Sequence, residues 1–207
     1  MGWLERIQRP SPSQSASAEP HESPAPPEER TSPGLAALFE ALSADGLHSV
    51  LDLGHAGTRH LELLSRYARR IRFAGLIPKA ADEEEWTAAL RSLPPNPDHP
   101  YDVVLAWDMV DRLEPEARQP VMRRLAEVTA PGARLYTVVD ASGAKATPPL
   151  RFSLVDFGRV AQRAVGEPEP TRRQLLPAQV ERVLEPFRVL HAFTLRTGLR
   201  EYVAMRP

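Results

Sequence analysis

The chain of 207 residues contains no cysteine, which excludes disulfide bonds, thiolate metal sites and cysteine nucleophiles. Its formal net charge is only −1, so no global field attracts nucleic acid or an anionic membrane surface. No apolar run approaches the roughly 18 residues of a membrane-spanning helix, and the first residues lack the apolar centre of a signal peptide. Composition therefore predicts a cytoplasmic protein that has no transmembrane segment and needs no nucleic-acid partner.

What is present is enough apolar material for an ordinary core. Hydrophobic residues make up 42% of the chain. A folded part of about 170 residues buries roughly 70% of the surface that its unfolded chain exposes. The length therefore predicts one domain and a tail.

The tail is expected at the N-terminus. Residues 8–33 are rich in Pro, Ser, Glu and Ala, and so few apolar side chains cannot offset the entropy cost of ordering the segment. Ahead of them, Trp3, Leu4 and Ile7 would share one face of a single helical turn. Residues 1–7 are either an untethered end or a short anchor for a partner or a membrane surface. We expect residues 1–33 to be a disordered tail and residues 34–207 to form the domain.

The rest of the chain alternates between strand and helix patterns. The expected strands are 48–54, 71–77, 101–108 and 133–140, and the expected helices are 34–42, 58–70, 82–93, 121–129 and 177–187, with another around 155–165. Such alternation predicts a parallel sheet with right-handed crossovers. Two last strands, 187–195 and 201–206, are joined so closely that they must be antiparallel.

The most informative stretch is VLDLGHAGTRH, residues 50–60. An apolar strand carrying Asp52 runs into Gly54, and a helix pattern follows at once. A nucleotide cofactor can lie against the helix N-terminus in such a strand–turn–helix unit. Ala56 and Thr58 stand where a nucleotide-binding loop would usually have glycine.

Four pieces in this order, VLDLGHAG, FAGLIPK, YDVVLAWDMVDRL with LAEVTAPGARLY, and the closing hairpin, resemble a class I S-adenosylmethionine-dependent methyltransferase. The resemblance covers residues 34–207. It implies an α/β fold with an open, mostly parallel, doubly wound (Rossmann-like) sheet that ends in an antiparallel hairpin. It also implies S-adenosylmethionine as cofactor and a small-molecule methyl acceptor.

The resemblance assigns cofactor-binding positions residue by residue. Asp52, Gly54 and Ala56 lie in the loop that wraps the methionine part of the cofactor in that family. Ile77 stands at the place of the acid that binds the ribose hydroxyls. Trp107 and Asp108 end the strand whose last residues face the donated methyl group. No catalytic residue is implied, since positioning supplies most of the rate of methyl transfer.

Three departures from the family pattern weaken the expected binding of the cofactor. A Cβ at Ala56 costs around 1 kcal/mol if the backbone there needs a positive φ. Ile77 cannot supply charge-assisted hydrogen bonds of roughly 1.5–3 kcal/mol each to a ribose diol. The stretch 78–100 is too short for the family's third strand.

Each polar candidate also has a structural interpretation. Asp52 would either orient the amino-acid end of the cofactor or cap the following helix, and Asp108 would either line the methyl-transfer pocket or cap residues 109–113. Ligands of open parallel sheets bind outside the carboxyl ends of the strands. This rule places Asp52, Ile77, Trp107, Asp108 and Asp140 around one crevice.

The histidines do not form a predicted metal site. His55 and His60 flank a turn, and their spacing does not put both rings on one face. We expect the His55 side chain to be exposed, with a position over the pocket as the alternative. His191 lies in the hairpin pattern and is expected to be packed or exposed at an edge. The HExxH, GxSxG and Walker motifs are absent, which leaves hydrolase and NTPase functions without support.

Two functions remain from the sequence. One is methyl transfer to an unidentified, small-molecule acceptor, with activity retained or lost. The other is an inactive methyltransferase fold that acts as a binding or scaffold protein, tethered through its tail to an unidentified protein partner. A nicotinamide-dependent oxidoreductase is disfavoured, because it also needs the loop glycines and does not account for the terminal hairpin.

Overall fold

The computed structural model describes residues 26–54, 57–74, 99–144, 146–165, 167–170 and 174–207. The predicted helix 82–93, the residues 1–7 and the stretch 78–98 lie outside these ranges. Within them the chain forms a central six-stranded sheet, a three-stranded sheet and a pair of two-residue strands, β6 (Ala146–Thr147) and β9 (Glu169–Pro170).

The central sheet has the strand order β10-β11-β5-β4-β2-β3. Its strands are β2 (His48–Asp52), β3 (Ala68–Phe73), β4 (Tyr101–Trp107), β5 (Thr129–Asp140), β10 (Arg188–Thr194) and β11 (Leu199–Met205). The strands β3, β2, β4 and β5 pair in parallel, while β11 is antiparallel to both β5 and β10. The predicted parallel sheet with a closing antiparallel hairpin is therefore confirmed.

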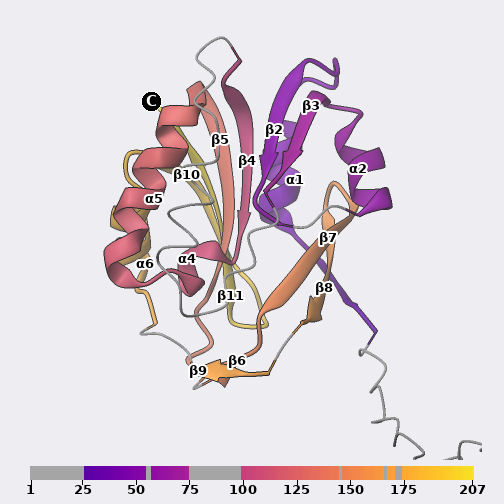
Figure 1. The fold of residues 1–207 in the computed structure, drawn as a ribbon. Coiled ribbons are helices and arrows are strands. Elements are labelled where there is room, and N and C mark those ends of the chain that lie inside the picture. Colours follow the sequence, from indigo (N-terminus) through magenta and orange to yellow (C-terminus); the bar gives the residue numbers. More distant parts are fainter. Residues whose placement is uncertain (1–25, 55–56, 75–98, 145, 166, 171–173) are drawn as a thin grey trace, which may run out of the picture.

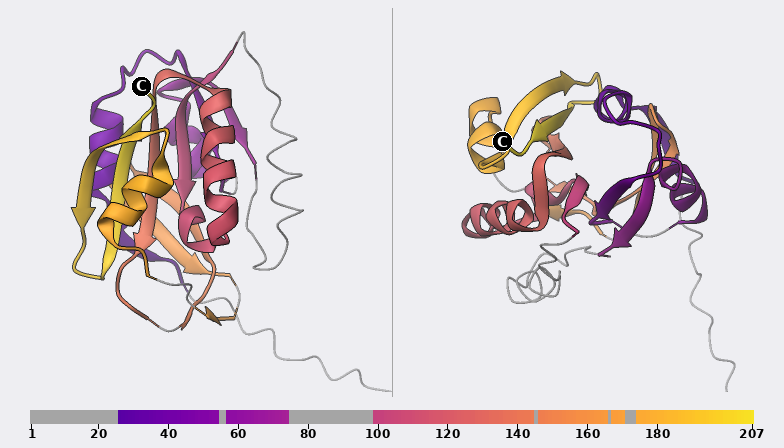
Figure 2. Two further views of the ribbon diagram at one scale, coloured as in Figure 1. Left: turned by 90° about the vertical axis from the view of Figure 1, so that its left-hand side faces the viewer. Right: turned by 90° about the horizontal axis from the view of Figure 1, so that it is seen from above.

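Helices cover both faces of this sheet (Figures 1 and 2). The helices α5 (Pro115–Val128) and α6 (Pro177–Leu184) pack on one face, over a core that includes Leu51, Val104 and Leu135. The helices α1 (Pro33–Glu40) and α2 (Thr58–Leu64) pack on the other face. A single turn, α4 (Met109–Arg112), follows β4. Helices on both faces make the fold doubly wound.

Two predicted helices are shorter or absent. The helix expected at 58–70 ends at Leu64, because residues 68–73 pair in parallel with β2 as strand β3. The helix expected around 155–165 is wrong: β7 (Leu150–Asp156) and β8 (Arg159–Ala164) form an antiparallel hairpin there. The Asp156 carboxylate accepts a hydrogen bond from the Gly158 amide, which closes the turn.

Strand pairing also extends the fold into the expected tail. β1 (Glu28–Thr31) pairs with β8, so the order of the three-stranded sheet is β1-β8-β7. Residues 28–31 were expected to be disordered, and their placement corrects that expectation. Arg30 forms an ion pair with the fully buried Glu201, 2.5 Å away, which also accepts a hydrogen bond from the Gly34 amide at 2.8 Å. A buried charge pair therefore fixes β1 to the hairpin side of the domain.

The small sheet lies on the same face of the central sheet as α1 and α2. Seen from above, it stands across from the strands β4 and β5 (Figure 2). Its inward side chains Phe152, Leu154 and Val160 join Leu38 and Val103 in one apolar core. The hairpin thereby covers the carboxyl edge of the central sheet, where the sequence places the site.

Candidate functional site

The carboxyl ends of β2, β4 and β5 meet at one edge, as the sequence predicted. Asp52 ends β2, Trp107 ends β4 with Asp108 directly after it, and Asp140 ends β5. Ala56, Ile77 and His55 lie outside the described residues. The four placed residues do not surround one crevice, because they separate into two environments.

Asp52 is completely buried and its carboxylate is turned into the protein. Its Oδ1 accepts hydrogen bonds from the Gly54 amide and from the Trp107 indole nitrogen, both at 2.7 Å. Its Oδ2 lies 2.8 Å from Nε2 of His60, which is itself 1% exposed. All three neighbours are parts of the protein, so Asp52 holds the turn between β2 and α2. The N-cap position of that helix is Gly57, which has no side chain to cap it.

Trp107 lies over this turn and is 3% exposed. Its backbone has a φ of +48°, a left-handed conformation that is strained for a bulky residue. The indole stacks on Phe152 of β7, with the ring centroids 5.3 Å apart and the planes at 4°. The hydroxyl of Thr137 donates a hydrogen bond to the Trp107 carbonyl. Packing on both sides therefore holds the strained residue in place.

We call Asp52, Gly54, His60, Trp107 and Phe152 the Trp107 junction. The ring of His60 packs edge-on against Trp107 and Phe73. The helix α2 turns this residue toward the sheet. His191, by contrast, is exposed on β10, as one of its two interpretations had it.

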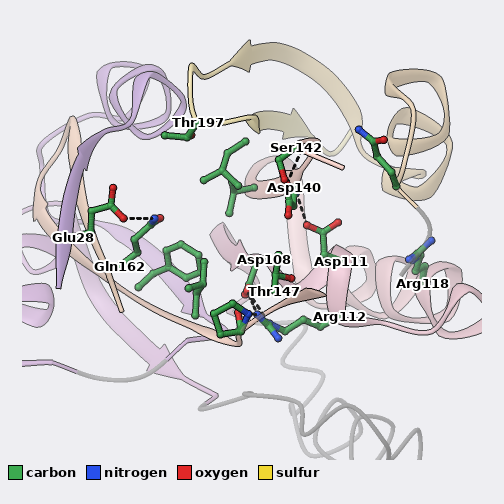
Figure 3. Close-up of a pocket in the computed structure, with 16 residues that line it drawn as sticks. Glu28, Asp108, Asp111, Arg112, Arg118, Asp140, Ser142, Thr147, Gln162 and Thr197 are labelled. Atoms are coloured by element: carbon green, nitrogen blue, oxygen red, sulfur yellow. Dashed lines mark hydrogen bonds and ion pairs between the residues drawn. The ribbon is translucent and has the colours of Figure 1, made fainter. Parts of the chain in front are cut away.

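Asp108 points into a cavity of about 260 Å³ at the ends of β4 and β5, which we call the Asp111 cavity (Figure 3). Its walls come from β1, α4, β5, β7, β8, the turn of the closing hairpin, Arg118 of α5 and Gln174. Asp108 pairs with Arg112 at 2.6 Å and gives no side-chain cap to α4. Asp111 accepts a hydrogen bond from the Asp140 amide at 2.5 Å.

The protonation of the cavity acids is unusual. Burial raises the pKa of Asp111 to about 7, and the charges of Asp108 and Asp140 add to the rise. Burial also raises the pKa of Asp108, against the opposing effect of Arg112. Perturbed carboxyl groups in a cleft mark candidate functional sites. Asp111 was not among the candidates from the sequence. Its position three residues after the strand-end Asp108, on the first turn of a helix, could have indicated it.

Within the described chain, no group of three or more His, Asp or Glu side chains could hold a metal ion. None of the helices described is long and apolar enough to cross a membrane.

The turn at Gly54 is crowded by side chains of the protein. A Cβ built on Gly54 would lie 2.8 Å from the indole nitrogen and 3.0 Å from Asp52 Oδ1, so the protein's own side chains occupy the space beside the glycine. The Asp111 cavity is not lined by Asp52, Gly54 or Trp107. The cofactor roles assigned to these residues stay predictions, and the positions that would meet the ribose lie outside the described residues.

The strand order defines a class I methyltransferase-like fold: the closing hairpin inserts β11 between β5 and β10, which separates this fold from plain dinucleotide-binding sheets. No family model matches the chain, and neither does any curated protein. Solved structures of methyltransferases do resemble it.

One is the glycopeptide N-methyltransferase MtfA complexed with S-adenosylmethionine, at 16% identity and a TM-score of 0.48, covering 85% of this chain and 95% of that one. Another is an S-adenosylmethionine-dependent methyltransferase from Mesorhizobium loti, at 15% identity and 0.49, covering 82% and 96%. A third is the pyocyanin biosynthetic protein PhzM, at 15% and 0.47, covering 84% of this chain; the chain spans about half of PhzM, 54%. At these values the likenesses carry no argument about activity.

Proposed function

We propose that this chain is a methyltransferase-fold protein that binds a small molecule in the Asp111 cavity and does not carry out methyl transfer. The single observation that carries the proposal is the occupied turn: Trp107 fills the space beside Gly54 and takes up Asp52 Oδ1. Both lone pairs of Asp52 Oδ1 already accept protein donors at 2.7 Å, and Oδ2 faces the buried His60 ring at 2.8 Å.

The energetics of reopening the turn support this proposal. The Trp107 indole would have to leave its stack with Phe152 and its hydrogen bond to Asp52. Exposing an aromatic side chain of this size costs about 3 kcal/mol before any ligand contact forms. A cofactor would also have to be held without an acid at Ile77, at a further loss of roughly 1.5–3 kcal/mol for each missing hydrogen bond.

The second candidate is methyl transfer, and one observation favours it. The Asp111 cavity begins at Asp108, directly after the end of β4. In the family that the sequence resembles, this strand ends beside the donated methyl group, so the cavity lies where an acceptor would be expected.

Calorimetric titration with S-adenosylmethionine and S-adenosylhomocysteine separates the two candidates. We expect no heat of binding and no shift in melting temperature for either ligand at about millimolar concentration, which corresponds to a binding free energy weaker than about −4 kcal/mol. Micromolar binding would overturn the proposal and favour methyl transfer. The variant Trp107→Phe, which removes the indole N–H and part of the ring, tests whether a weak signal arises at the junction.

A further inference from the structure

The size of the Asp111 cavity limits what it can hold. At about 260 Å³ it lies just below the range of roughly 300–1,000 Å³ that is usual for drug-sized ligands. Its walls come from eight secondary-structure elements and their connections, so the fold as a whole shapes it. A ligand of a few connected functional groups fits this space.

The charge on the cavity walls is negative. Four carboxylates line it against two guanidinium groups: Glu28, Asp108, Asp111 and Asp140 against Arg112 and Arg118. Arg112 is committed to Asp108 at 2.6 Å and also donates to the Pro148 carbonyl. Arg118 donates to the Val110 carbonyl. The excess of acid remains on the side of Asp111 and Asp140, with Glu28 opposite (Figure 3).

Part of the remaining wall is apolar, and the rest carries hydroxyl and amide side chains. Val138, Leu150, Phe152 and Leu199 line the cavity between the charged groups. The Phe152 ring is held in a fixed orientation by its stack on Trp107. An apolar wall beside acids favours a ligand with a cationic end and an apolar body.

We propose that the Asp111 cavity binds a small organic cation, an amine attached to an apolar group, with its ammonium between Asp111 and Asp140 and its apolar part against Leu150 and Phe152. This inference rests on the proposed function, which makes the cavity the ligand site. An ionised carboxylate accepts about four hydrogen bonds. Asp111 receives one from the Asp140 amide and Asp140 one from the Ser142 amide, so acceptor capacity remains for an ammonium group.

Binding is coupled to the protonation of Asp111. The charged and titratable groups around it are Asp108 and Arg112 on its own turn, Asp140 on β5, Arg118 on α5 and the neutral phenol of Tyr202 on β11. A cation binds the ionised form of Asp111, whose free pKa is about 7. Affinity should therefore rise between pH 5.5 and pH 8, and binding near pH 6.5 should release a proton.

Phenethylamine is the probe that tests this chemistry, with 3-phenylpropionate as its anionic counterpart of similar shape. In calorimetric titrations of the full chain at pH 8, we expect phenethylamine to bind at about millimolar affinity or tighter, and 3-phenylpropionate not to bind. In Asp111→Asn the affinity for the amine should fall about tenfold, the loss of one charge-assisted hydrogen bond. Glu127→Gln makes the same change on an exposed part of α5 and should bind as the wild type does.

Three results would overturn the inference: no saturable binding of the amine, equal binding of the acid, or unchanged affinity in Asp111→Asn. If that variant fails to fold, the pH profile of the wild type decides, because flat affinity between pH 5.5 and pH 8 excludes Asp111 as the acceptor. Failure here leaves the proposed function standing as long as S-adenosylmethionine does not bind. If S-adenosylmethionine binds at micromolar concentration and phenethylamine does not bind, both the proposed function and this inference are overturned.

Discussion

The Trp107 junction and the Asp111 cavity lie side by side at the carboxyl edge of one sheet. The consecutive residues Trp107 and Asp108 belong to the junction and to the cavity wall, respectively. In the junction, the Asp52 carboxylate is fully buried between protein donors, and aromatic rings close over it. In the cavity, Asp111 keeps acceptor capacity and faces empty space. The same edge thus contains one acid used for structure and one available to a ligand.

The difference teaches that strand-end position alone does not make a residue functional. Open parallel sheets place strand-end residues at a potential binding edge. Whether a crevice exists there depends on what covers the edge. Here Phe152 of the β7–β8 hairpin covers Trp107 and, through it, the turn at Gly54, while a cavity remains beside Asp108, Asp111 and Asp140.

Removing the indole should break the junction with the largest effect. Trp107→Ala deletes the stack with Phe152 and leaves Asp52 without one donor, which should lower the free energy of unfolding by about 3–5 kcal/mol. Urea unfolding followed by circular dichroism measures this. Trp107→Phe keeps most of the packing and should lose about half as much; equal losses would place the energy in the hydrogen bond.

The two strand-end acids should differ in their structural weight. Asp52→Ala leaves the half-buried amide of Gly54 and the buried indole N–H of Trp107 unpaired and should cost about 2–4 kcal/mol. Among the described residues, the Asp140 carboxylate accepts a bond from the exposed Ser142 amide, so Asp140→Ala should cost less than about 1 kcal/mol. Thermal unfolding of both variants compares them, and similar losses would contradict the division into a structural acid and a ligand-facing acid.

Two glycines of the loop should respond differently to a methyl group. In Gly54→Ala the new Cβ would lie 2.8 Å from the Trp107 indole, and overpacking should cost about 1–3 kcal/mol. Gly57 has an extended backbone, with a φ of −139°, and its nearest neighbour would be the His60 Cβ at 3.9 Å. Gly57→Ala should be neutral or stabilising by up to about 1 kcal/mol. Equal effects in urea unfolding would mean that the indole does not occupy the turn.

The smallest expected effect is the gain in stability at high pH when the Asp111 carboxylate is removed. Because the pKa of Asp111 is raised from 3.8 to about 7, the folded state binds more protons than the unfolded state between these values. The free energy of unfolding therefore falls as pH rises through this window. Asp111→Asn should remove much of the slope and stabilise the protein at pH 8 by about 1–2 kcal/mol. Asp108, whose pKa burial also raises, should retain part of the slope.

A stability profile measured from pH 4 to pH 8 for the wild type and Asp111→Asn tests the sign. A variant that is less stable at pH 8, or a wild type that gains stability over this window, would show that the Asp111 carboxylate is not desolvated in the cavity.

The sequence predicted the sheet well, because near-continuous apolar runs such as 48–54 and 101–108 are typical of parallel strands that are buried on both faces. It also predicted a first helix at 34–42, and in the structure the Ser32 side chain accepts the hydrogen bond that caps α1. The closing hairpin followed from the short polar connection between two strand patterns. Each of these features is formed by residues that are close together in the sequence, so the sequence alone indicates it.

The misses all involve contacts between distant segments. Residues 155–165 have apolar spacings that suit a helix, but pairing with β7 and β1 makes them a strand. Residues 28–31 are polar, and only the partner β8 and the buried Glu201 order them. The contacts of His60 with Asp52 and Trp107 were also not predicted, because nothing in its neighbourhood along the chain indicates them.

The sequence by itself determined the sheet, its parallel centre, its antiparallel end and the positions of acids at the strand ends, since periodicity and turn chemistry are written along the chain. Only the tertiary structure decided which of those acids is enclosed and which faces a cavity. The physical reason is that burial is set by what packs over a residue. Phe152, a hundred residues after Asp52 in the chain, supports the indole that closes the turn.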